Sequence, residues 1–104
     1  MLELKIKDVV YDMVIYEIFI DGEYAGSLEG NYQAETNSFF IENIKKSNDY
    51  KGKEVLKKVV DYLHKDKKVD IGCLPLPKYR SYYEKLGFKK YLQHGEDIFY
   101  QLKA

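Results

Sequence analysis

Residues 82–89 read Tyr-Tyr-Glu-Lys-Leu-Gly-Phe-Lys and mark the passage from a helix to a strand. Tyr82, Tyr83 and Leu86 recur at helical spacing, so they predict one apolar face of a helix. The glycine then ends the helix, because glycine tolerates the left-handed conformation of a C-terminal cap. The phenylalanine after it begins a strand. The end of the chain is therefore predicted to combine helices with strands.

A second, longer helix is predicted upstream, from Gly52 onward. Its apolar positions fall on one helical face and are Val55, Leu56, Val59, Val60 and Leu63. N-cap candidates precede it at residues 47–49, which are Ser-Asn-Asp. Pro77 is placed as the first residue of the other helix. The short apolar stretch Val69–Cys73, between the two helices, is predicted to be a buried strand.

The first half of the chain has the alternating and β-branched patterns of strands. Asp21-Gly22 is a strong hairpin signal, and Gly30-Asn31 is expected to close the strand that follows it. The chain ends in a predicted hairpin around residues 94–96. The strands predicted outside the helical region are Leu2–Lys7, Met13–Ile20, Glu23–Leu28, Ser38–Ile44, Phe88–Leu92 and Ile98–Leu102.

Length and composition predict a single domain over residues 1–104 with a core large enough to fold unaided. No signal peptide or membrane span is visible, and Cys73 is the only cysteine, which fits a reducing cytoplasm. Two histidines are too few to suggest a metal site.

The net charge is zero, and no RNA-binding signature is visible, which argues against a nucleic-acid partner. Residues 1–50 carry net −6 and residues 51–104 carry net +6, a split that fits either an anionic cofactor with a cationic acceptor or uneven surface charge.

The segment Tyr83-Glu84-Lys85-Leu86-Gly87-Phe88 resembles the helix-to-strand junction of the GNAT family, the acetyl-CoA-dependent N-acetyltransferases. The predicted order β-β-β-β-α-β-α-β-β is also similar to that of the family, without the two helices that usually follow the first strand. This resemblance implies an α+β fold: a mixed, mostly antiparallel sheet with two helices. It also implies acetyl-CoA as cofactor and an amine as acceptor.

The resemblance places the pyrophosphate of acetyl-CoA at residues 51–56, Lys-Gly-Lys-Glu-Val-Leu, where the family pattern is R/Q-x-x-G-x-G/A. Backbone N–H groups at the start of a helix bind such phosphates. Gly52 matches the pattern as a glycine, and the flanking Lys51 and Lys53 match it as cations. Glu54 and Leu56 replace small residues of the pattern, so the loop is interpreted as degraded. The cofactor-binding residues that this implies are Lys51, Gly52, Lys53, Glu54, Val55 and Leu56.

The same resemblance gives Tyr83 the role of general acid toward the leaving thiolate, and Glu42 is the candidate general base. The alternatives are that Tyr83 packs against the sheet and that Glu42 is a solvated surface residue. Three functions remain open. One is acetyl transfer from acetyl-CoA to an amine-bearing acceptor, either a protein or another accessible amine. The second is a catalytically inactive module of the same fold that binds a protein or another ligand. The third is a small interaction protein that presents its sheet edge or its tyrosine-rich helix to a protein partner. The oligomeric state does not follow from the sequence.

Overall fold

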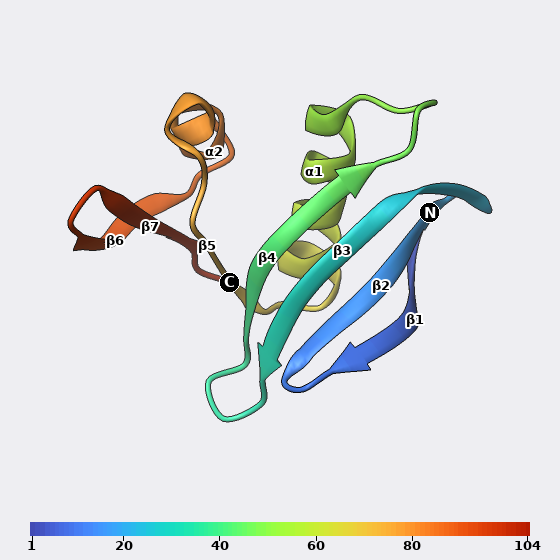
Figure 1. Ribbon diagram of the computed structural model, residues 1–104, viewed down its shortest axis with the longest axis horizontal. Helices are drawn as coiled ribbons and strands as arrows, with labels where there is room; N and C mark the ends of the chain where they lie inside the picture. Colours follow the sequence, from blue (N-terminus) through green and yellow to red (C-terminus); the bar gives the residue numbers. More distant parts are fainter.

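The computed structural model describes residues 1–104 as one seven-stranded sheet with α1 against one face and α2 near β5 and β7 (Figure 1). The spatial order is β1-β2-β3-β4-β5-β7-β6, and only β4 and β5 pair in parallel. The predicted order of elements is confirmed. Their bounds are β1 (Leu2–Val10), β2 (Met13–Ile20), β3 (Glu23–Gln33), β4 (Ser38–Lys46), α1 (Gly52–Asp61), β5 (Asp70–Cys73), α2 (Arg80–Lys85), β6 (Lys89–His94) and β7 (Asp97–Leu102).

The strands β1 to β4 form a continuous antiparallel meander. β1 passes directly into β2 through a two-residue turn, so no helix lies between them. The predicted hairpin at Asp21-Gly22 is confirmed, since both residues adopt positive φ, 51° and 85°, as a tight two-residue hairpin requires. Lys7 is an extra residue in β1, where the pairing with β2 shifts register.

The prediction that Gly30-Asn31 ends the third strand is wrong, because β3 continues to Gln33. Gly30 belongs to the middle of the sheet and pairs with Val14 and Ile41. A Cβ at this glycine would lie 2.5 Å from the Phe39 ring and from a main-chain oxygen of β4. The glycine is therefore required by close packing rather than by a turn.

Helix α1 packs its apolar face on the sheet. Val55 and Val59 are fully buried, and the core of sixteen side chains draws on α1, β2 to β5, β7, Leu63, Val69 and Phe88. The helix continues as a π-helical turn, Tyr62–Asp66, which keeps Leu63 in the core. None of the helices reaches the length and apolarity that are needed to cross a bilayer.

The starts of both helices differ from the sequence prediction. The N-cap of α1 is Lys51, which has no side-chain capping bond, so the expected cap within residues 47–49 is wrong. Those three residues form the turn that follows β4, and the amide N–H of Ser47 donates to the carbonyl of Ala25 at 2.8 Å. Pro77 does begin a helical segment, but as a 3-10 turn, Pro77–Tyr79, that leads into the short α2.

Candidate functional site

The candidate site begins where β4 and β5 part. Their parallel pairing runs from Ser38 opposite Asp70 to Ile41 opposite Cys73, where β5 ends. β4 continues to Lys46 and diverges from the chain that leads to α2 (Figure 1). Glu42, the first residue beyond the pairing, is also the extra residue of a bulge against β3. One side of β4 therefore has no strand partner from Glu42 onward.

A cleft of about 590 Å³ occupies this divergence. Its walls are the second half of β4, the first turns of α1, the segment that follows β5, and α2. The volume is within the range of small-molecule sites, which is about 300–1,000 Å³. Nine of its fifteen lining residues are hydrophobic. The polar groups that face it come mainly from Glu42, Lys46, Lys53 and three tyrosines of the α2 region, Tyr79, Tyr82 and Tyr83.

The N-terminus of α1 supplies free hydrogen-bond donors to one wall. The first bond of α1 is donated by the Val55 N–H to the Lys51 carbonyl at 3.1 Å, and no side chain caps the helix. The N–H groups of residues 52–54 thus have no helical acceptor, and the helix dipole makes this end attractive to anions. Lys46 and Lys53 add positive charge beside it. Leu56, only 8 % exposed, fills part of the same wall.

The opposite wall is formed by α2. Tyr83 is half-buried, and its ring meets that of Phe88 edge-on, with centroids 5.3 Å apart. Burial raises the pKa of Tyr83, with smaller contributions from the neighbouring Cys73 and Tyr82, so its phenol is protonated at neutral pH. The hydroxyl of Tyr82 donates to the main-chain oxygen of Lys53 at 2.9 Å, which ties α2 to the start of α1.

The structure brings five of the eight sequence-predicted site residues to the cleft: Glu42, Gly52, Lys53, Leu56 and Tyr83. The other three lie elsewhere. Val55 is fully buried in the core, and Lys51 and Glu54 are exposed and do not line the cleft. Positions 52, 53 and 56 share a helical face, whereas positions 54 and 55 point away from it. Whether these residues hold a cofactor stays a prediction.

Sequence reasoning did not assign Lys46 or Tyr82 to the site. Lys46 reaches the cleft because β4 extends two residues beyond its predicted end. The sequence signal for Tyr82 was its position directly before Tyr83. In the structure its hydroxyl contacts the start of α1. No group of three or more His, Cys, Asp or Glu side chains is arranged to hold a metal ion.

Cys73 also lines the cleft, but its chemistry is that of a packed side chain. It is 2 % exposed, and burial raises its pKa to about 12. A thiolate is the reactive form, so we expect no labelling of the native protein by iodoacetamide at pH 8 and full labelling in guanidinium. Mass spectrometry measures both. Rapid labelling of the folded protein would show that this thiol is accessible.

The fold is similar to those of solved N-acetyltransferases. The N-acetyltransferase PseH of Campylobacter jejuni, solved in complex with acetyl coenzyme A, superposes with a TM-score of 0.65 at 15 % identity, over 90 % of this chain and 70 % of that chain. An acyl-CoA N-acyltransferase of Pseudomonas aeruginosa gives 0.62 at 15 % identity, over 93 % and 71 %. An acetyltransferase of Thermus thermophilus gives 0.67 at 14 % identity, over 92 % and 67 %.

No family model matches the sequence, and no curated protein matches it. At 14–15 % sequence identity, the similarity to these solved structures establishes the fold alone. The resemblance first indicated by residues 83–88 is therefore confirmed at the level of the GNAT fold.

Proposed function

We propose that this chain, which has the GNAT fold, is an N-acetyltransferase that moves an acetyl group from acetyl-CoA to an amine. The observation that carries the proposal is the cleft at the divergence of β4 and β5, which unites an uncapped helix N-terminus with Tyr83. The N–H groups of residues 52–54 would hold the pyrophosphate, with Lys46 and Lys53 as counter-charges. Acetyl-CoA, when bound, supplies the activated thioester.

The unpaired side of β4 offers backbone N–H groups that can hydrogen-bond the bound cofactor and polarise a carbonyl. Tyr83 is the proposed donor to the departing sulfur, and burial keeps its phenol protonated for that role. Glu42 is the proposed base, because it is exposed at the bulge of β4 and lines the cleft. The acceptor is proposed to be a protein or another accessible amine, and the setting a reducing cytoplasm.

A second candidate is a non-catalytic module that retains this fold. Leu56 favours it, because its buried side chain lines the wall where a phosphate needs close approach to the backbone. The Glu54 carboxylate, in the first turn of the same helix, opposes an anion there. Such a module would use the cleft or the sheet for a protein or another ligand without turnover.

Titration with acetyl-CoA and CoA tests both candidates. We expect saturable binding by calorimetry, with NMR amide shifts at residues 50–57 and at Tyr83. Lys53→Gln should weaken binding about fivefold, because an exposed ion pair contributes up to about 1 kcal/mol. The matched control is Lys58→Gln, since this lysine of α1 does not line the cleft. An amine panel then tests for transfer.

The outcomes separate the two candidates. Binding followed by acetylation of an amine supports the enzyme. Binding without transfer to any amine or protein acceptor would contradict the proposed reaction but keep the cofactor assignment. Absence of binding at millimolar acetyl-CoA would contradict both the cofactor assignment and the proposed reaction, and it would support the non-catalytic module.

A further inference from the structure

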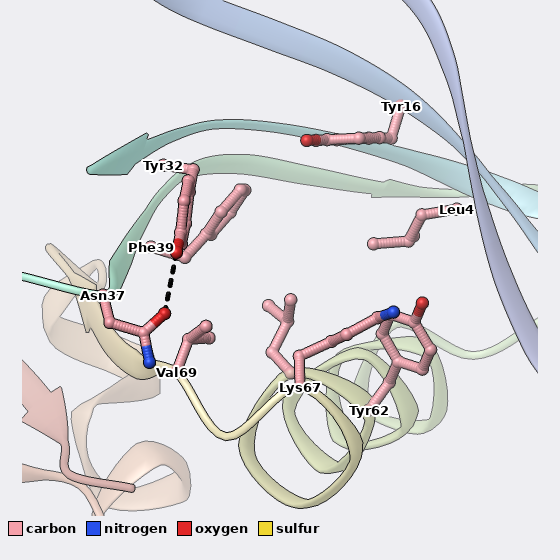
Figure 2. Close-up of a pocket in the computed structure, with 9 residues that line it drawn as sticks. Leu4, Tyr16, Tyr32, Asn37, Phe39, Tyr62, Lys67 and Val69 are labelled. Carbon is pink, nitrogen blue, oxygen red and sulfur yellow. Dashed lines mark hydrogen bonds between the residues drawn. The ribbon is translucent and has the colours of Figure 1, made fainter. Parts of the chain in front are cut away.

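A second cavity, of about 350 Å³, lies at the other end of α1 from the cleft. It lies between the sheet and the chain that follows α1, namely the π-helical turn and the residues up to Val69, and it opens to solvent (Figure 2). Seven of its nine lining residues are hydrophobic. It shares no lining residue with the cleft between β4 and α2, so the function proposed above makes no use of it.

Aromatic rings dominate its walls. Tyr16 and Phe39 project from the sheet with centroids 6.2 Å apart, and Tyr62 faces them from the π-helical turn (Figure 2). Tyr32 closes one end, where its hydroxyl donates to Asn37 Oδ1 at 2.7 Å (Figure 2). The Asn37 amide in turn donates to the Lys68 carbonyl at 3.0 Å, which fixes this wall. A flat apolar ligand in this cavity could therefore contact the faces and edges of aromatic rings on several sides.

The polar side chains of the cavity can all donate hydrogen bonds. Lys67 is its only charged lining residue and takes part in none of the three ion pairs of the protein. Its ammonium lies 5.5 Å from the centre of the Tyr62 ring. Burial, and secondarily Tyr62, raise the pKa of Tyr16, so its phenol is a neutral donor at pH 7. No hydrogen bond within the protein occupies the hydroxyl of Tyr16 or of Tyr62.

We propose that this cavity binds a small organic anion, a carboxylate carried on a flat aromatic body. The aromatic walls would take the ring system, and Lys67 with the neighbouring hydroxyl of Tyr62 would take the carboxylate (Figure 2). The positive charge of Lys67, which no acidic lining residue offsets, disfavours a cationic ligand. A neutral aromatic compound would fill the same space but leave the lysine without a counter-charge.

Three naphthalene derivatives of equal shape provide the probes: 2-naphthoate, neutral 2-naphthamide and cationic 2-naphthylmethylamine. We expect 2-naphthoate to bind with a Kd of about 1 mM or below, as its size allows. The amide should bind about fivefold more weakly, as expected for loss of a solvent-exposed ion pair. The amine should bind more weakly still. NMR amide shifts should centre on Tyr16, Phe39 and Lys67 and leave Gly52 and Lys53 unmoved.

Charge-specific variants make the test decisive. Lys67→Met retains the apolar stem and should weaken 2-naphthoate about fivefold while leaving 2-naphthamide unchanged. Lys65→Met, a change two residues before Lys67 and outside the cavity, should leave both affinities unchanged. Equal binding of acid and amide, equal loss in the two variants, or shifts centred on another surface would each overturn the proposal. Acetyl-CoA binding plays no part in these readouts, so failure here is distinguishable from failure of the proposed enzyme activity.

Discussion

Tyr83→Phe should lower kcat for acetyl transfer about 100-fold and leave the affinity for acetyl-CoA within about twofold. The change removes one hydroxyl from the cleft and preserves the ring that packs edge-on against Phe88. Loss of a single positioned donor or acid costs about 10²–10⁴ in rate. We expect the lower end of that range. The raised pKa of this phenol lies above that of an ordinary thiol, so in the proposed reaction it would stabilise the leaving sulfur more by hydrogen-bond donation than by complete proton transfer.

Steady-state kinetics and an equilibrium titration on the same preparations check this prediction. Tyr91→Phe is the matched control, because it deletes a tyrosine hydroxyl on β6 outside the cleft. Its kcat should equal that of the wild type. An unchanged kcat in Tyr83→Phe would show that this tyrosine is a packing residue and that the sulfur leaves without its help.

Gly30→Ala should lower the free energy of unfolding by about 3 kcal/mol. The added methyl group would fall 2.5 Å from two atoms of the Phe39 ring and 2.5 Å from the Phe40 carbonyl oxygen. Neither neighbour yields easily, because Phe39 is a core residue and the oxygen belongs to the backbone of β4. Overpacking of this kind costs about 1–3 kcal/mol, and a clash with backbone belongs at the upper end.

Urea unfolding followed by far-UV circular dichroism measures the effect as a shift of the midpoint at constant m-value. Gly72→Ala is the control, because it is also a strand glycine and its nearest neighbour, an atom of the Phe40 ring, would be 3.3 Å away. It should cost less than about 1 kcal/mol. Equal losses in the two variants would show that strand flexibility, rather than the contact at Gly30, sets the cost.

The sequence predicted the elements of this fold well because its patterns are local. Alternation marked the strands, the Asp21-Gly22 turn specified a hairpin, and the apolar face of α1 fixed its orientation. The sequence-based prediction failed where contacts with a distant part of the chain determine the local structure. The end of β3 was misplaced because a glycine that makes room for Phe39 resembles one that makes a turn. The π-helical turn after α1 has no signal in the apolar spacing.

The candidate site was predictable in part for the same reason. The segment at the start of α1 was recognisable as a run of residues, but a run does not show which members face a cleft. Gly52, Lys53 and Leu56 do, whereas Val55 enters the core. The divergence of β4 from β5 depends on where β5 ends and on the bulge at Glu42. Both are properties of pairing, and pairing partners are not visible in one strand's sequence.

The extra residue at Lys7 has a consequence for how the molecule behaves in a crowded solution. β1 is an outer strand, so its free N–H and C=O groups could recruit a strand from another chain. Its first half alternates apolar side chains with Glu3, Lys5 and Lys7, and the irregularity at Lys7 interrupts the regular edge. Charge and a bulge are the devices by which natural sheets avoid edge-to-edge aggregation. β1 thus resists uncontrolled assembly, although no helix follows it to cover the sheet.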